Sequence, residues 1–357
     1  MPARRDFSLW LLALGVAGCA APPRSAAPGA PPMWPVPPEQ PRYLYEAVLR
    51  HAGSVGDPSS SGQMRRMLTG EQDRSSFGKP FAVAAGGGRV YVTDTEGRRV
   101  FVFDLVRRRT FSFGTRLEGE LKKPAGIALD AQGQVYVVDS TARRVVVYDA
   151  LGLFRREIDG ARSWVRPTAI AVAPSGERVY VVDTGGVESQ SHRVFVYDAD
   201  GKPAGVIGTR GSALGEFNLP ADAAVAPDGT LWVLDAGNFR VQAFSADANP
   251  LRAFGSVGQG IGQFARPRGL AIDRDGLIYV SDANFGNVQV FRPDGVLLLA
   301  LGARAERDTP GHYLLPGKLA SDETGRLYVV DQYFHKVEVV RRLSDAEGKR
   351  LMAAAAP

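Results

Sequence analysis

Short apolar runs recur along most of the chain, and polar turns separate them. Each run has five residues, contains an aromatic side chain in every copy, and ends on an aspartate. Runs of this length bounded by Gly, Asp and Pro are typical of strands and too short for helices. They are apolar on both faces, which predicts sheets packed between two neighbours. The six runs are Val90 to Asp94, Val135 to Asp139, Val179 to Asp183, Leu231 to Asp235, Ile278 to Asp282 and Leu327 to Asp331.

The apolar runs belong to one longer repeat. A proline and a strand rich in small residues precede each run, and a further apolar strand follows it. From Asp94 to Asp331 the five intervals span 237 residues, so the period is about 47 residues, which is the length of a propeller blade. The repeat therefore predicts an all-β, six-bladed propeller with four-stranded blades. Its prolines are Pro80, Pro124, Pro167, Pro220, Pro267 and Pro316.

The last copy lacks its outer strand. Its third strand, over residues 336–342, is followed only by a tail at 344–357. The apolar segment 43–50 stands alone before the first copy, so we expect it to supply the missing strand and to remove an open sheet edge. The propeller is then predicted to span residues 42–343. We also expect a short basic helical turn over 63–68.

The first 18 residues are predicted to be an export signal. Arg4 and Arg5 precede a twelve-residue apolar stretch, 7–18, which has the length of a signal-peptide core and is too short to cross a bilayer. In the segment that follows, from Ala20 to Pro41, nine of 22 residues are proline. We therefore expect residues 19–41 to form an extended tether.

The end of the apolar stretch, Val16-Ala17-Gly18-Cys19, resembles the lipobox of bacterial lipoproteins. In that family the signal is cut before the cysteine, which then carries diacylglycerol. The resemblance implies a lipid on Cys19 as the anchor to the membrane. Ala20 follows the cysteine, and in that family a residue other than Asp there implies sorting to the outer membrane. The alternative is an ordinary secretory signal with a chance cysteine.

The repeat itself resembles the NHL repeat, over roughly residues 75 to 343. The copies most similar to it are 262–273 (GQFARPRGLAID) and 235–244 (DAGNFRVQAF). The resemblance implies a six-bladed propeller. Such propellers include protein binders, RNA binders, lyases and lactonases, so the function has to be inferred from residues that break the repeat.

Three charged residues break the small-residue pattern near the start of the inner strands. Asp222 and Lys318 stand where the other copies have Ala or Gly, and Arg268 lies one position earlier in its copy. Inner strands converge on the axis of a ring, so we expect the three side chains at one mouth of the channel, where they would bind a polar or anionic group. The alternative is a mutual salt bridge that fills the channel.

An insertion after the third aspartate is expected on the same face of the ring. It carries Glu188 and His192, and we interpret it as a recognition loop or, equally, as a tolerated surface loop. On the opposite face, residues 107–109 form a run of three arginines at a hairpin tip. This run is interpreted as solvated, with contact to acidic lipid or protein as the alternative.

Signals of catalysis are few. A single cysteine excludes a disulfide framework and a multi-cysteine zinc site. Of the four histidines only His192 and His335 share a repeat position, on opposite sides of the ring, so the zinc site of lyase-type propellers lacks a ligand set. For a lactonase-type metal site Asp222 is the one carboxylate available. We predict no catalytic residue, no cofactor and no metal site, and we expect the repeated aspartates to cap turns or pair with basic residues.

Charge and compartment narrow the class of partner. The chain has 43 basic and 38 acidic residues, a net charge of +5 that is too weak to indicate nucleic acid. We predict an exported, monomeric propeller, held in the bacterial cell envelope by the lipid on Cys19, that serves as a binding platform for another envelope protein. The alternative function is a propeller-type metal-dependent lyase or lactonase with a channel site.

Overall fold

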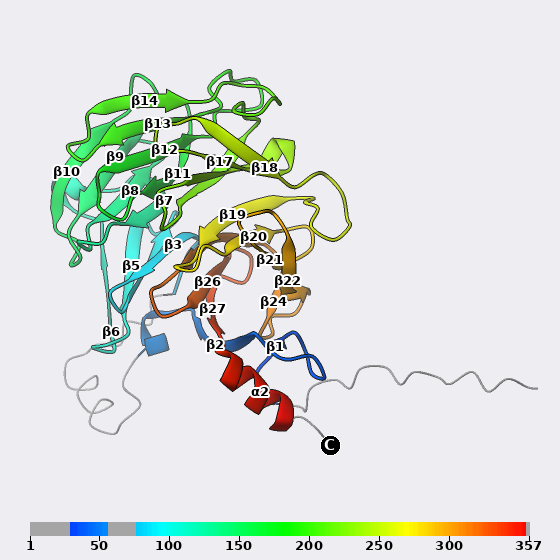
Figure 1. The fold of residues 1–357 in the computed structure, drawn as a ribbon. Coiled ribbons are helices and arrows are strands. Elements are labelled where there is room, and N and C mark those ends of the chain that lie inside the picture. Colours follow the sequence, from blue (N-terminus) through cyan, green and yellow to red (C-terminus); the bar gives the residue numbers. More distant parts are fainter. Residues whose placement is uncertain (1–28, 56–75, 355–357) are drawn as a thin grey trace, which may run out of the picture. The chain divides into compact units, whose positions relative to one another are not determined.

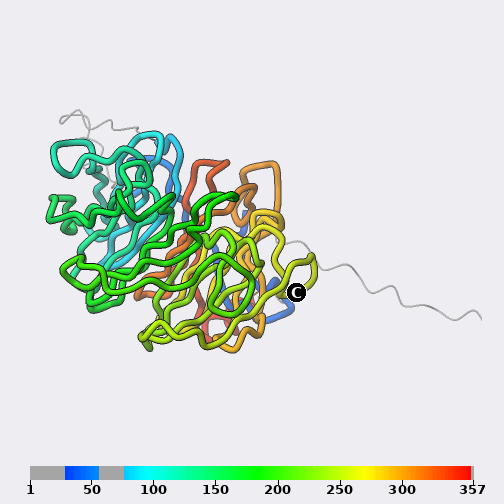
Figure 2. Tube along the Cα trace, turned by 90° about the horizontal axis from the view of Figure 1, so that it is seen from above, coloured from blue at the N-terminus to red at the C-terminus, as the bar shows by residue number. Residues whose placement is uncertain are grey.

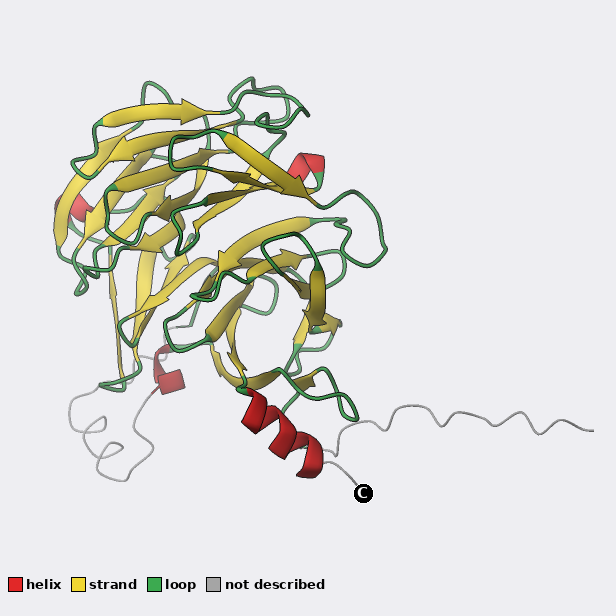
Figure 3. Cartoon of the chain, viewed as in Figure 1, coloured by secondary structure: helices red, strands yellow, loops and turns green. Residues whose placement is uncertain are grey.

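Six antiparallel sheets form a ring, as the repeat predicted (Figure 1; Figure 3). The computed structural model describes residues 29–55 and 76–354, and the chain from Pro31 onward is one compact unit. The signal segment, Cys19, residues 20–28 of the predicted tether and the segment 63–68 lie outside the described residues, whereas residues 29–41 of the tether are described. Among the residues described, no helix has the length and apolar character needed to cross a bilayer.

Blades one to five each consist of four strands that are consecutive in the chain. The strands are β3 to β6 (Pro80–Gly86, Arg89–Asp94, Arg99–Asp104, Arg109–Phe113), β7 to β10 (Pro124–Leu129, Val135–Asp139, Arg144–Tyr148, Phe154–Asp159), β11 to β14 (Pro167–Val172, Arg178–Asp183, Arg193–Asp198, Pro203–Ile207), β15 to β18 (Pro220–Val225, Leu231–Asp235, Arg240–Phe244, Pro250–Phe254) and β19 to β22 (Pro267–Ile272, Ile278–Asp282, Asn287–Phe291, Leu297–Leu301).

Blade six combines the two ends of the described chain. Its sheet consists of β25 (Pro316–Ser321), β26 (Arg326–Asp331), β27 (Lys336–Arg342), β2 (Tyr43–Leu49) and β1 (Met33–Trp34). Outside the blades, β23 (Ala303–Arg304) and β24 (His312–Tyr313) form a short parallel pair. The other elements are the 3-10 turns η1 (Ala52–Val55), η2 (Leu117–Gly119) and η3 (Ala236–Asn238) and the helix α2 (Asp345–Ala354).

The inner strands close the ring, so that the last blade, orange to red in Figure 2, lies beside the first, in cyan. Each inner strand packs on the next, in the order β3, β7, β11, β15, β19, β25 and back to β3. The strands approach so closely that a Cβ added to Gly126 would lie 2.6 Å from Cα of Ala169, and one on Gly269 would collide with the backbone of Gly317. Small side chains at these positions are therefore a requirement of the fold.

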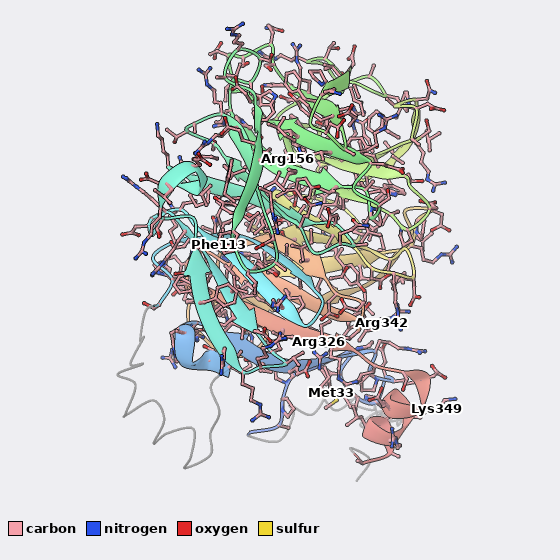
Figure 4. All side chains as sticks on the ribbon, turned by 90° about the vertical axis from the view of Figure 1, so that its left-hand side faces the viewer. Met33, Phe113, Arg156, Arg326, Arg342 and Lys349 are labelled. Carbon is pink, nitrogen blue, oxygen red and sulfur yellow. The ribbon has the colours of Figure 1, made fainter. Side chains whose placement is uncertain are left out.

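Strand β2 closes the ring as the sequence predicted. It pairs antiparallel with β27 from Tyr43 opposite Arg342 to Leu49 opposite Val337, and the two segments lie side by side in Figure 1. Glu46 of β2 also receives two hydrogen bonds of 2.7 Å from the guanidinium of Arg326, which is labelled in Figure 4. The closing strand is thus held by both backbone and side chains.

The packed part of the chain extends beyond the predicted limits of 42–343. Strand β1 pairs with β2, and the ring of Trp34 packs against Gly311 and the core between blades five and six. At the other end, the predicted tail is the helix α2, which approaches the N-terminal segment through an ion pair of 2.5 Å between Arg42 and Asp345. The two ends of the domain are therefore in direct contact, and Figure 4 shows Met33 and Lys349 on the same side of the ring.

Helix α2 begins with a capping box that the sequence analysis missed. The Ser344 backbone N–H and hydroxyl donate to Glu347 Oε2 at 2.9 and 2.7 Å, and the Glu347 N–H donates back to the Ser344 hydroxyl. A serine followed three residues later by glutamate satisfies two of the free N–H groups at a helix start. This pattern explains why the tail is helical.

The capping box makes helix α2 sensitive to acid. The Ser344 N–H and hydroxyl, together with Arg341, lower the pKa of Glu347 from 4.5 to about 2. Since the folded pKa lies below the unfolded one, the stabilisation is complete above pH 4.5 and is lost as the pH falls toward 2. We expect amide exchange in α2, relative to exchange in β26, to accelerate over this range. A Glu347→Gln variant should have a smaller acid dependence, because only Asp345, whose pKa the hydrogen bond from Arg42 lowers, then remains to titrate at the helix start. An unchanged dependence in that variant would contradict this assignment.

Candidate functional site

All six inner strands begin at the same end of the ring. In each blade the proline that starts the inner strand lies opposite the aspartate that ends the second strand, from Pro80 and Asp94 to Pro316 and Asp331. The connections between blades and the turns between second and third strands therefore lie together. We call this end of the ring the proline face, and the end formed by the other turns the opposite face.

The repeated aspartates hold the proline face together. Each is fully buried and accepts hydrogen bonds from backbone N–H groups of the preceding interblade connection, most also from N–H groups of its own turn. Asp139, for example, accepts from the N–H groups of Lys122, Lys123 and Ala142. Among the ion pairs of the described residues, Arg240 is the only third-strand base paired with its aspartate, at 2.9 Å. The turn-capping role predicted for these residues is therefore the main one.

Two of the three predicted channel-mouth residues meet across the axis. Lys318 Nζ of blade six lies 3.0 Å from Asp222 Oδ1 of blade four, and both side chains are buried. The Lys318 ammonium also donates to the carbonyl of Ala221, and Asp222 accepts from the N–H groups of Leu270 and Ala223. The ion pair therefore fills the channel below the proline face, as the salt-bridge alternative described.

Burial shifts the ionisation of both partners. Loss of solvent raises the pKa of Asp222 and lowers the pKa of Lys318, and in each case the charge of the other partner offsets part of the shift. Hydrogen bonds from the backbone N–H groups of Leu270 and Ala223 also lower the pKa of Asp222 and so favour its charged form. The pair stays charged only while both members are present, because a lone buried ion carries the full cost of desolvation.

Arg268 does not join this ion pair. Its guanidinium donates to Gln332 Oε1 at 2.9 Å, toward the turn of blade six, and the side chain is half-buried. Burial and the neighbouring positive charge of Arg266 lower the pKa of Arg268. The structure thus places Arg268 at the proline face, separate from Asp222 and Lys318 but adding positive charge above them.

The loop 185–192 lies on the proline face and is anchored at its base. His192 is fully buried, and its Nε2 lies 2.9 Å from the Gly186 carbonyl while the Leu219 N–H donates to Nδ1. Ser191 donates to the buried Asp183 at 2.7 Å. Glu188 is exposed at the tip. His192 is therefore a structural anchor of the loop, and Glu188 is the member available to a partner.

Below the ion pair the channel opens as an apolar hollow toward the opposite face. Its volume is about 180 Å³, and it is lined by three consecutive residues of each inner strand, from Val83–Ala85 to Leu319–Ser321. Ser321, its one polar side chain, donates to the Ile272 carbonyl. No group of three or more His, Cys, Asp or Glu side chains suited to a metal ion occurs within residues 29–55 and 76–354.

The proline face also carries exposed apolar side chains that the sequence analysis missed. Leu117 and Ile261, in two interblade connections, are each 91% exposed, and Val257 and Tyr333 lie on the same face. Leu117 has a backbone φ of +55°, which is strained for a leucine and typical of functional positions. In the sequence, the signal for such an exposed position is a single apolar residue within an interblade connection that contains glycine.

Comparison with known families identifies the repeat. The NHL repeat matches residues 121–148, 217–244 and 264–291, which correspond to the first three strands of blades two, four and five and the residues before them. The chain therefore contains NHL repeats, in blades two, four and five of a six-bladed β-propeller. None of the curated proteins compared with the chain matches it.

Solved structures share the fold at low identity. A Bacteroides thetaiotaomicron protein of unknown function has a TM-score of 0.58 and 17% identity, covering 82% of this chain and 75% of that one. A Xanthomonas campestris gluconolactonase has a TM-score of 0.54 and 19% identity, covering 84% and 98%. A virginiamycin B lyase from Staphylococcus aureus has 0.53 and 11%, covering 74% and 80%. These likenesses show the fold alone.

Proposed function

We propose that this protein is a lipid-anchored component of the bacterial cell envelope whose propeller binds another envelope protein through the proline face. The anchor is a lipid on Cys19, supported by the Val16-Ala17-Gly18-Cys19 sequence after an apolar stretch of signal-peptide length. The part of the proline-rich segment that precedes the compact unit, residues 20–30, sets the reach of the propeller from the membrane. Tethering raises the local concentration of the binding face near partners in the same membrane.

The exposed apolar loop tips on the proline face carry this proposal. Leu117 and Ile261 extend from the connections that precede blades two and five, and Val187, at the tip of the loop 185–192, is exposed as well. Burial of exposed apolar side chains against a partner stabilises the complex by about 25 cal/mol per Å² of apolar surface removed from water. Leu117 also has a backbone φ of +55°, a conformation that costs free energy in a residue other than glycine.

The scaffold is suited to presenting such tips without rearrangement. The connections that bear them are tied to buried aspartates, and the ring is closed by β2. A rigid surface loses little conformational entropy when a partner binds to it. The proline face therefore resembles a preformed docking surface more than a loop that orders on binding.

Lipidation and docking are tested in the same cells. Palmitate labelling should be lost in Cys19→Ser, and labelling that persists would contradict the anchor. A Leu117→Ser/Ile261→Ser variant should lose a partner that co-purifies with the wild-type protein. The matched control is Val106→Ser/Leu151→Ser, because Val106 and Leu151 are 75% and 61% exposed on the opposite face. Equal loss from both variants would contradict the assignment to the proline face.

A further inference from the structure

The residue immediately before the inner-strand proline is basic and exposed in four of the six blades. These residues are Lys79, Lys123, Arg166 and Arg266, and we call them the cationic rim. The equivalent positions in blades four and six are Leu219 and Leu315. None of the four rim side chains takes part in an ion pair within the described part of the chain. Because each immediately precedes an inner strand, all four lie on the proline face, where the Asp222–Lys318 pair closes the channel.

Further cations lie beside the rim on both sides of the mouth. Between blades one and two, a hollow of about 720 Å³ is lined by Lys79, Lys123, Arg98 and Lys122, against two carboxylates, Glu96 and Glu120. Near blade five, Arg266 is close enough for its charge to lower the pKa of Arg268. Unpaired like charges held together repel one another, and this repulsion costs free energy until an anion joins them.

The opposite face is mixed in charge near the axis. Its turns between first and second strands carry four exposed acidic side chains, Glu177, Asp228, Asp275 and Glu323, beside the exposed Arg178 and Arg274. The rim position, by contrast, carries only cations where it is charged. A surface of one sign of charge attracts a partner of opposite charge and speeds its association.

We propose that the cationic rim binds a carboxylate-rich segment of the partner protein, at the mouth of the blocked channel. This inference rests on the proposed docking function and names the chemistry of the partner. The rim offers four separate cations at one level, and exposed apolar tips such as Ile261 surround it. An acidic protein segment with apolar neighbours matches both features, whereas a nucleic acid supplies phosphates without apolar side chains for the outer tips.

The test uses the full chain, solubilised in detergent, and a fluorescent peptide of about twelve residues rich in Glu and Leu. Fluorescence anisotropy should show binding that weakens as salt is raised, because exposed charge pairs are screened. Neutralising the rim with K79Q/K123Q/R166Q/R266Q should weaken binding at least about tenfold. The control R107Q/R108Q/R109Q/R178Q removes four exposed arginines from the opposite face and should leave binding within about twofold of wild type.

Two results would overturn the inference. One is equal peptide affinity in the rim and control variants. The other is tighter binding of a single-stranded oligonucleotide of equal charge, which would assign the rim to phosphates. Unchanged thermal midpoints in both variants confirm that the rim residues, being exposed, are not needed for folding. If the peptide does not bind but partner capture still depends on Leu117 and Ile261, this inference fails and the proposed function stands. If the peptide binds the rim but partner capture does not depend on Leu117 and Ile261, the proposed function fails and the binding chemistry of the rim stands.

Discussion

Replacing Asp222 with alanine is expected to lower the free energy of unfolding by about 3 to 5 kcal/mol. The substitution leaves the Lys318 ammonium buried with only the Ala221 carbonyl as a partner, and it also removes the acceptor of the Leu270 and Ala223 N–H groups. An unpaired buried charge is among the most costly defects in a folded protein. Chemical unfolding followed by circular dichroism measures the loss.

Removing both charges separates the lost ion pair from the uncompensated charge. The double variant Asp222→Leu/Lys318→Met should recover more than half of the loss, since apolar residues of similar volume often replace a buried ion pair without cost. Asp200→Ala, at an exposed position of blade three, should stay within about 0.5 kcal/mol of wild type. A double variant as unstable as Asp222→Ala would show that the ion pair is not what fills the channel.

Replacing Tyr43 with alanine should cost about 3 to 5 kcal/mol, because Tyr43 is a buried aromatic residue of the closing strand. Its hydroxyl lies 2.9 Å from that of Tyr279, which donates to Asp273, and Arg342 holds the same carboxylate. Burial raises the pKa of Tyr43 to about 12, so the hydroxyl remains protonated and acts as a donor at neutral pH. Urea unfolding of the purified protein measures the effect.

Two variants check the role of ring closure. Tyr43→Phe keeps the ring and loses one hydrogen bond, so it should cost about 1 kcal/mol. Tyr333→Ala removes an aromatic side chain that is 59% exposed, and its effect on stability should be small. A Tyr43→Ala variant as stable as wild type would mean that β2 does not hold the ring closed.

The fold could be predicted from the sequence because the same pattern of strands and turns occurs in six copies. Each copy repeats the proline, the small inner strand and the aspartate, so chance matches are averaged out. Closure by β2 followed from counting strands, since a ring with one outer strand missing leaves an edge. Helix α2 was missed because its capping box, Ser344 and Glu347, precedes no strongly apolar face.

The site was harder to predict than the fold. Asp222 and Lys318 occupy the same repeat position, so both point toward the axis, whereas Arg268 stands one position earlier. Successive side chains of a strand point to opposite sides, and Arg268 accordingly reaches Gln332 instead of the pair. Which residues meet across a channel depends on the ring, and a single repeat does not contain that information. The exposure of Leu117 and Ile261 likewise depends on how the connections are tied down.

Site-specific photo-crosslinking in intact cells tests most directly whether the proline face is the docking surface. A photoreactive residue at Ile261 or Leu117, on the proline face, should give one discrete adduct of the same mass. The same residue at Val106 or Leu151, which are also exposed but lie on the opposite face, should give none. Adducts of equal yield from both faces, or from the opposite face alone, would contradict the account.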